Sequence, residues 1–123
     1  MAFGVKERQK DGERKPTRAF SKRQESGVAK ALGGSRTPNS GATPWIKGDV
    51  IAGDFLIECK TKTKPSESIA VHKEWLEKNS AEALMMGKRY SAVAIQFGPG
   101  ERNYFVIDEE LFAILKETLS AGK

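Results

Sequence analysis

Residues 47–62 read KGDVIAGDFLIECKTK, and the apolar pattern of this stretch decides the fold. Two runs that are typical of β-strands, Lys47–Ala52 and Phe55–Thr61, are separated by a Gly-Asp pair. A two-residue connection that begins with glycine is typical of a tight hairpin turn of type I′ or II′. The sequence therefore predicts a β-hairpin in which Ala52 pairs with Phe55.

That pairing fixes the register of the hairpin. It sets Asp49 directly opposite Glu58, on the face that also carries Lys60. Opposed side chains in a strand pair have Cβ atoms about 5 Å apart, so the two negative charges repel each other. The other face has the pattern of a core, with Val50, Ala52, Phe55, Ile57 and Cys59.

Two carboxylates that are held together need a cation. Lys60 supplies one positive charge, and a divalent metal ion would supply more. Oxygen ligands without a His or Cys cluster favour Mg²⁺, with Mn²⁺ as a substitute, over zinc. Two carboxylates and a lysine beside such an ion suit phosphodiester hydrolysis. The alternative is that Asp49, Glu58 and Lys60 form an exposed cluster on a solvated sheet face.

The excess positive charge is concentrated at the N-terminus. The chain has 123 residues, which suits one domain, and a net charge of +5. Residues 1–24 contain eight basic and three acidic side chains, whereas residues 25–123 contain thirteen of each. We expect residues 1–20 to form a flexible basic arm and residues 21–123 a single domain. Such an arm favours nucleic acid over a membrane as partner, and the alternative is a solubilising tail.

Several classes of protein are excluded by the composition. The longest run of apolar side chains has five residues, Leu111–Leu115, which is too short for a transmembrane helix. The first twenty residues contain no apolar segment of the kind that a secretory signal needs. The single cysteine supports neither an internal disulfide nor a cysteine zinc site. We therefore expect a protein that is not secreted and resides in the cytoplasm, or in the host cytoplasm if the source is viral.

The other elements follow from periodicity and turn signals. Ser21 and Gln24 have the spacing of a capping box, which predicts a helix over residues 22–32 that ends at a Gly-Gly pair. Gly27 inside this helix suggests the close approach of another backbone. The chain then continues with a loop over 33–47, the hairpin, a short strand over 68–71, a helix over 73–86, strands over 92–97 and 104–107, and a helix over 109–119 that Asp108 caps. The order α-β-β-β-α-β-β-α predicts an α/β fold with a mixed central sheet flanked by helices.

Asp49 and the triplet Glu58-Cys59-Lys60 resemble the D…(D/E)-x-K motif of the PD-(D/E)XK nuclease superfamily, although Gly48 stands where that motif has proline. The surrounding order of elements, over about residues 24–107, is similar to that of archaeal-type Holliday junction resolvases, including versions carried by phages. The resemblance implies a restriction-endonuclease-like fold and a homodimeric, Mg²⁺-dependent endonuclease. Such an enzyme resolves branched DNA, the four-way junction, by paired symmetric nicks.

The resemblance also assigns roles to particular residues. Glu25, on the first helix, would complete a metal site with Asp49, Glu58 and the backbone carbonyl of Cys59, and Lys60 would be the catalytic lysine. The DNA contacts implied by the resemblance and by the basic N-terminus are Arg36, Ser40 (with Ser35 as a neighbouring candidate), Lys62, Lys73, Arg18, Lys22 and Arg23.

Alternative interpretations stay open for several of these residues. Glu25 is also consistent with an exposed position on a helix, and Arg36 with a solvated charge. His72 suits an exposed surface better than a general base, and Trp75 suits the core better than a base stack. Trp45 favours contact with DNA or a partner subunit. At the level of function, the alternatives are another DNA nuclease of flap or restriction type, or a non-catalytic nucleic-acid-binding module.

Overall fold

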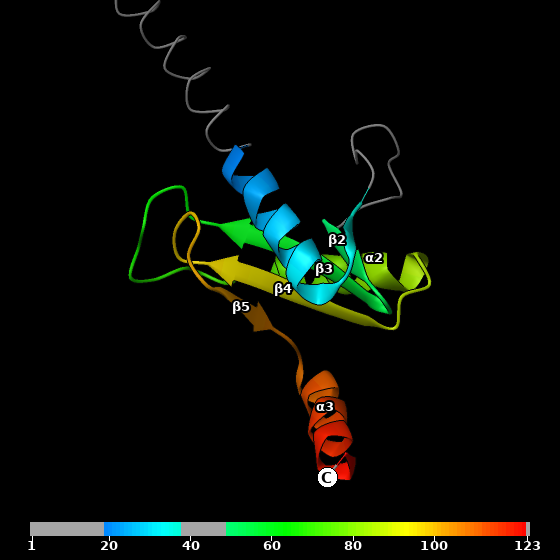
Figure 1. The fold of residues 1–123 in the computed structure, drawn as a ribbon. Coiled ribbons are helices and arrows are strands. Elements are labelled where there is room, and N and C mark those ends of the chain that lie inside the picture. The colour runs from blue at the N-terminus through cyan, green and yellow to red at the C-terminus, as the bar shows by residue number, and fades with distance from the viewer. Residues whose placement is uncertain (1–18, 38–48, 123) are drawn as a thin grey trace, which may run out of the picture.

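A five-stranded mixed β-sheet forms the centre of the protein (Figure 1). The structure, a computed structural model, describes residues 19–37 and 49–122. Its strands lie in the order β1 (Ser35–Arg36), β2 (Val50–Ala52), β3 (Phe55–Thr61), β4 (Tyr90–Gln96) and β5 (Asn103–Val106). Strands β3 and β4 are parallel and the other neighbours are antiparallel. Three helices accompany the sheet: a first helix described over residues 19–32, α2 (Lys73–Met85) and α3 (Glu109–Ala121). The predicted α/β class with a mixed sheet is confirmed.

The predicted hairpin is present, and its register holds up to Val50. Strands β2 and β3 pair Ala52 with Phe55 and Val50 with Ile57. Gly53 has a φ of +58°, whereas no non-glycine residue among those described has a positive φ. Positive φ at the first turn position alone is the requirement of a type II′ turn, so the Gly-Asp pair forms the turn that its order predicts.

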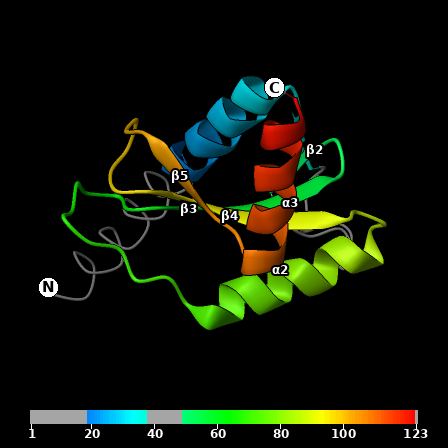
Figure 2. The same cartoon turned by 90° about the horizontal axis from the view of Figure 1, so that it is seen from below.

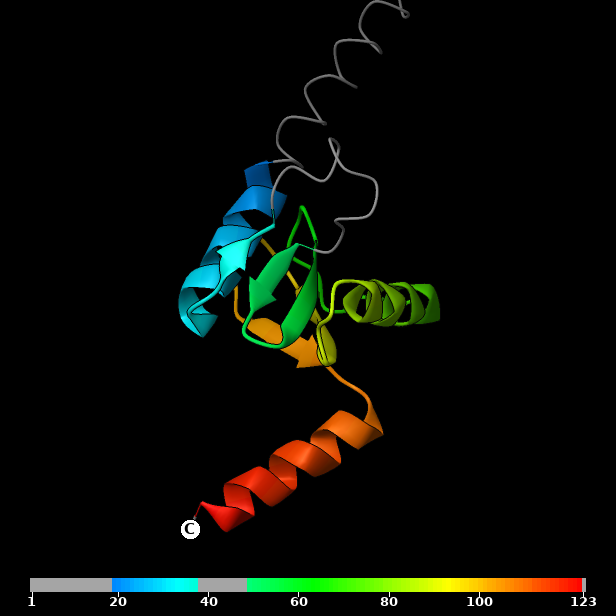
Figure 3. The ribbon, with the colours of Figure 1, turned by 90° about the vertical axis from the view of Figure 1, so that its right-hand side faces the viewer.

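Helices cover both faces of the sheet, and the alternation along β3 determines what each helix contacts. The first helix and α2 lie on opposite sides of the sheet (Figures 2 and 3). Val28 and Ala29 of the first helix are buried against Val50 and Ile57, on the face that the sequence predicts as core. Helix α2 packs on β3 and β4 and buries Asn79 there. This arrangement leaves Glu58 and Lys60 on the side of α2.

The first helix ends where the sequence predicts but does not begin as predicted. Gly33 has a φ of +67°, and the Gly34 amide donates to the Ala29 carbonyl at 2.8 Å, which closes the last turn. The capping box is wrong, because residues 19 and 20 are already helical and Gln24 is 2% exposed in the interior. The expected close approach at Gly27 is also wrong, since nothing lies within 4 Å of a Cβ placed there. That approach occurs instead at Gly34, where a Cβ would collide with the Ile51 carbonyl.

Two further predictions on strands are wrong. Residues 68–71 form no strand; the chain there leads irregularly into α2. Residues 35 and 36, which lie within the predicted loop over 33–47, form the edge strand β1 and pair with β2. The remainder of the predicted loop, over 38–47, lies outside the described residues, as does most of the predicted arm.

The C-terminal elements agree with the sequence. Asp108 caps α3, since its side chain accepts a hydrogen bond of 2.9 Å from the Leu111 amide. The turn between β4 and β5 contains Gly100 with a φ of +76°. Among the described residues, no helix is long and apolar enough to cross a membrane.

Candidate active site

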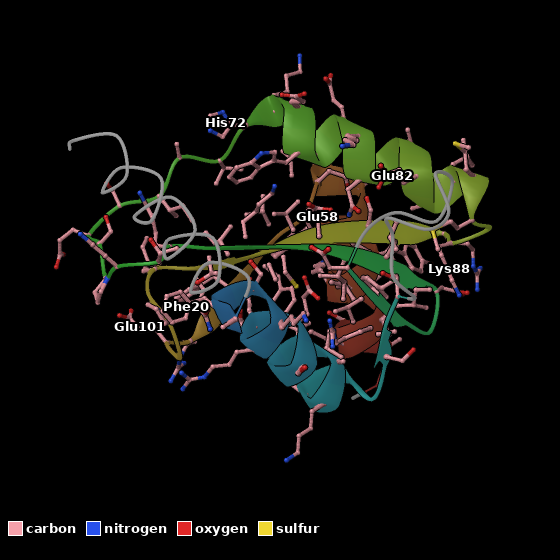
Figure 4. The ribbon with its side chains drawn as sticks, turned by 90° about the horizontal axis from the view of Figure 1, so that it is seen from above. Phe20, Glu58, His72, Glu82, Lys88 and Glu101 are labelled. Carbon is pink, nitrogen blue, oxygen red and sulfur yellow. The ribbon has the colours of Figure 1, made fainter. Side chains whose placement is uncertain are left out.

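The carboxylates that the sequence predicts as a site come from three elements around the N-terminal end of β2. Glu25 lies on the first helix, Asp49 directly precedes β2, and Glu58 lies on β3. Figure 4 shows Glu58 in the space between the sheet and α2, with the first helix on the other side of the sheet. The three side chains are half-buried, and the charge of Asp49 acts on both of the others.

Asp49 does not stand directly opposite Glu58 as predicted. Its amide donates to the Ile57 carbonyl at 3.0 Å, although Ile57 is already the partner of Val50. Two residues thus face one, which is the arrangement of a β-bulge. The Asp49 carboxylate accepts a hydrogen bond of 2.7 Å from the Cys59 amide. The bulge turns the Asp49 side chain out of the regular alternation of the strand. This is the physical reason why Asp49 does not face Glu58.

Burial makes the Asp49 carboxylate hard to ionise. Desolvation raises its pKa above the ordinary value for aspartate. The hydrogen bond from the Cys59 amide and the charges of Lys60 and Arg36 oppose this rise without cancelling it. Among the described residues, Asp49 has no ion pair of its own, so its charge is only partly neutralised.

Glu58 and Lys60 form an ion pair on the side of α2. Their Oε2 and Nζ atoms are 3.4 Å apart, and Lys60 Nζ also lies 4.7 Å from the ring centroid of Trp75. The pKa of Glu58 is raised, first by desolvation and then by the charge of Asp49. A cavity of about 220 Å³ lies beside this pair and is also lined by Trp75, Asn79, Glu74 and Lys78.

Glu25 is paired with a guanidinium group instead of facing Asp49 alone. Arg36 Nε donates to Glu25 Oε1 at 3.2 Å. The pKa of Glu25 is nevertheless raised, by desolvation first and by the charge of Asp49 second. Its side chain is 17% exposed, so the interpretation of Glu25 as an exposed helix residue is wrong.

Two buried amides hold the strands of the site in place, and the sequence did not predict either role. Gln24 Nε2 donates to the carbonyls of Lys60 and Ala94 at 3.1 and 3.2 Å. Asn79 Nδ2 donates to the carbonyls of Leu56 and Ala92 at 3.1 and 3.0 Å. Each amide therefore bridges β3 and β4, one from each face of the sheet. A polar residue among the apolar positions of an amphipathic helix was the available signal.

Cys59 faces the apolar side of the sheet, as its register predicts. It packs against the core cluster, and burial together with the neighbouring carboxylates raises the pKa of its thiol far above the usual range. The thiol is therefore unsuited to act as a nucleophile or a soft metal ligand. The role of its backbone carbonyl as a metal ligand stays a prediction.

The donors of the candidate site fit a hard divalent cation in kind. Glu25, Asp49 and Glu58 offer carboxylate oxygens in a half-buried, under-neutralised setting, which suits Mg²⁺ or Mn²⁺. As the side chains stand, no three acidic, His or Cys groups of the described residues are close enough to share one ion. Glu25 would have to exchange Arg36 for the ion.

The predicted DNA contacts are only partly brought to the site. Arg36 reaches it through Glu25, whereas Arg23 packs over the β4–β5 turn, where a Cβ at Gly100 would lie 2.7 Å from its Nη2. Lys73 is 85% exposed and pairs with Glu77 at 3.7 Å, away from the cavity. Of the other candidates, Lys62 is half-buried and Lys22 is exposed. Arg18 and Ser40 lie outside the described residues.

Lys78 and Trp75 belong to the site by position. Lys78, one helical turn beyond Trp75 on α2, lines the cavity beside Lys60, so it takes the place that was predicted for Lys73. Trp75 is half-buried and contacts Lys60, so it is not simply a core residue. His72 is exposed, as expected, and its ring contacts that of Trp75 in a tilted arrangement, with ring centroids 4.7 Å apart. Trp45 lies outside the described residues.

No family model, curated protein or solved structure matches this chain.

Proposed function

We propose that this protein is a metal-dependent DNA endonuclease with a restriction-endonuclease-like fold, acting as a homodimer on four-way junctions. One observation carries the proposal: the charge of Asp49 acts on both Glu25 and Glu58, all three carboxylates are half-buried, and the charge of Lys60 acts on Asp49 and Glu58. A purely structural ion-pair network would match each carboxylate with a cation. Here the pKa of each of the three carboxylates is raised despite the nearby cations, with desolvation as the largest cause, which favours a site that binds a further positive charge.

The oxygens of Glu25, Asp49 and Glu58, with the Cys59 carbonyl, would hold Mg²⁺ or Mn²⁺. When bound, such an ion polarises a phosphate and makes a bound water more acidic. The contribution of the chain is to fix these oxygens in place. The Cys59 amide orients Asp49 at 2.7 Å, and Gln24 holds the Lys60 backbone at 3.1 Å.

Lys60 is the residue that we assign to the reacting phosphate. Its ammonium group is held between Glu58 and the face of Trp75, and it is 33% exposed, so it is both oriented and accessible. From this position Lys60 would orient the attacking water or neutralise the charge that develops on the phosphate. Lys78, on the opposite wall of the same cavity, adds a second positive charge for the backbone of the nucleic acid.

Arg36 has two roles in this proposal. Paired with Glu25, it neutralises a carboxylate in the absence of an ion. Its side chain is 43% exposed, so it is free to turn toward a phosphate once Glu25 has another partner. Arginine suits this exchange because its planar guanidinium group binds carboxylates and phosphates in the same way.

The test is cleavage of three synthetic substrates, a four-way junction, a flap and a linear duplex, with Mg²⁺, Mn²⁺ or EDTA. We expect symmetric nicks in the junction that require the divalent ion. Glu58→Gln and Lys60→Ala should each reduce the rate by about 100-fold or more. The matched control is Glu77→Gln, which removes a carboxylate that is 66% exposed on α2, and it should cut like the wild type.

Each other outcome identifies which part of the proposal is wrong. Equal cutting of the linear duplex would refute the preference for junctions and favour a restriction-type nuclease, and preferred cutting of the flap would favour a flap nuclease. Metal-dependent cutting that survives Glu58→Gln would refute the site. Salt-sensitive binding to all three substrates without cleavage under either ion would favour a non-catalytic nucleic-acid-binding module.

A further inference from the structure

Helix α3 extends away from the rest of the molecule (Figures 1 and 3). Its start is anchored, because Asp108 caps it and Leu111 is 5% exposed beside α2 and β4. From Phe112 to the end of the helix, every residue is exposed. The helix is thus held at one end only and offers most of its length to a partner.

The exposed part of α3 carries an apolar stripe. Phe112, Leu115 and Leu119 follow one another at helical spacing and are 64%, 38% and 71% exposed. Together with Leu111 and Thr118 they form one side of the helix, which contains no charged residue. Side chains of this size on one helix face are normally buried against another element. The stripe is therefore the part of α3 that is available to pack against a partner.

The stripe is symmetric about Leu115. Leu111 and Phe112 precede it by four and three residues, and Thr118 and Leu119 follow it by three and four. A second α3 that runs antiparallel about a twofold axis at Leu115 sets the exposed Phe112 of each helix against Thr118 and Leu119 of the other, while Leu111 anchors the helix to its own chain. Such a self-complementary pattern is the requirement of an interface between two identical chains.

Strand β5 directly precedes this helix along the chain and is also exposed. It is an edge strand of the sheet, it leads directly into α3, and its Tyr104 and Phe105 are 51% and 42% exposed. Two helices of this length, about 20 Å each, bury less than the roughly 1,600 Å² of a standard interface. The edge strand that leads into the helix supplies both further area and unpaired backbone groups.

We propose that α3 and the outer edge of β5 form the surface through which two copies of this chain associate, with the two α3 helices antiparallel about Leu115. An anionic membrane suits this surface less well, because the polar side of α3 carries Glu109, Glu110 and Glu117 but only one lysine among its described residues, Lys116. The inference names the surface that would join the two sites of the proposed nuclease, but it does not depend on cleavage.

The experiment measures the oligomeric state of the full chain by sedimentation velocity, from about 1 to about 100 µM. We expect a dimer for the wild type and at least tenfold weaker association for Leu115→Glu, which sets two like charges against each other at the twofold axis. The matched control is Ala113→Glu, on the opposite side of α3, and it should remain a dimer. An equimolar mixture of Leu115→Glu and Leu115→Lys should recover association, because unlike charges then meet at the axis.

A second measurement covers the case in which a charged variant does not fold. Leu115→Cys, with Cys59→Ala as background, should form a disulfide-linked dimer on mild oxidation, whereas Ala113→Cys in the same background should not. The proposal is overturned if the wild type is monomeric throughout the concentration range. It is equally overturned if Leu115→Glu associates as the wild type does, or if neither the charge mixture nor the Leu115→Cys oxidation yields a dimer.

Discussion

The buried side chain of Gln24 joins the fold to the candidate site. Its Nε2 group offers two hydrogens to three acceptors, the carbonyls of Lys60 and Ala94 and the Oδ1 atom of Asn103, at 3.0 to 3.2 Å. The side chain is 2% exposed, so water cannot replace it. Gln24→Glu keeps the shape of the side chain and removes both of these hydrogens.

The cost of Gln24→Glu follows from this geometry. A buried carboxylate that faces three acceptors must take up a proton, which costs about 1.4 kcal/mol for each pH unit above about 4.3, or close to 4 kcal/mol at pH 7. The protonated group donates only one hydrogen, so at least one hydrogen bond, worth about 1 kcal/mol, is lost as well. The total of about 5 kcal/mol is a large part of the 5–15 kcal/mol that stabilises a typical domain.

The dependence on pH gives this prediction its sign. The new carboxyl group is protonated in the folded chain and ionised in the unfolded chain at neutral pH, so the unfolded state binds fewer protons. The free energy of unfolding of the variant should therefore fall as the pH rises. At about pH 5 the deficit relative to the wild type should shrink to about 2 kcal/mol.

Glu25→Gln is the matched control, at the adjacent position and with the reverse exchange. Burial and the charge of Asp49 raise the pKa of Glu25, so its ionised form weakens the folded state at neutral pH. The neutral amide still offers an oxygen to Arg36. We expect Glu25→Gln to increase the free energy of unfolding slightly, by less than about 1 kcal/mol.

Urea denaturation, followed by far-UV circular dichroism at about pH 5 and about pH 7, measures both variants. A loss below about 1 kcal/mol for Gln24→Glu at neutral pH would refute the reasoning, because a group that water reaches has no such cost. A deficit that stays constant between the two pH values would refute the assigned cause, since a lost hydrogen bond alone does not titrate.

Three further predictions concern the fold and the site. Gly27→Ala should stabilise the protein by about 1 kcal/mol, because a Cβ there meets open space. Gly34→Ala should destabilise it by about 2 kcal/mol, because a Cβ there meets the β2 backbone. Urea denaturation measures both changes. Asp49→Asn should raise the free energy of unfolding at neutral pH, because the folded-state pKa of Asp49 is raised. The gain should vanish as the pH falls to about 4. A gain that grows on acidification would contradict this prediction. If the proposed nuclease is correct, Trp75→Leu should slow cleavage of a four-way junction about tenfold at saturating DNA, whereas Trp75→Phe, which keeps an aromatic face for Lys60, should slow it less.

Much of the fold could be predicted because local signals agreed with tertiary packing. A Gly-Asp turn and two alternating strands fixed the β2–β3 register, and Asp108 marked the start of α3. The strand predicted over 68–71 failed because a short apolar run has no preference of its own without a neighbour to pair with. Strand β1 was missed for the converse reason, since Ser35 and Arg36 form a strand only through their pairing with β2.

The residues of the site could be predicted more readily than its geometry. The spacing of Asp49 and Glu58 pointed to a shared site, but a bulge leaves no mark in residue spacing, and it changed where Asp49 points. Trp75 was assigned to the core and Lys78 was not singled out, because helical periodicity shows the apolar face of α2 and not what stands opposite that face. Contacts between α2 and β3 are long-range and have no local signal.

The bulge before β2 is what combines carboxylates from both faces of the sheet. In a regular hairpin, Asp49 would stand over Glu58 on the side of α2, with the sheet between it and the first helix. Because the Asp49 amide turns to the Ile57 carbonyl instead, its carboxylate binds the Cys59 amide and its charge acts on Glu25 as well as on Glu58. Among the described residues, Glu25 is paired with Arg36 and Glu58 with Lys60, whereas Asp49 has no ion pair of its own. If the proposed nuclease is correct, a divalent ion at Asp49 would compete with Arg36 on one side and with Lys60 on the other, so that metal binding would release the two cations that the proposal assigns to a phosphate.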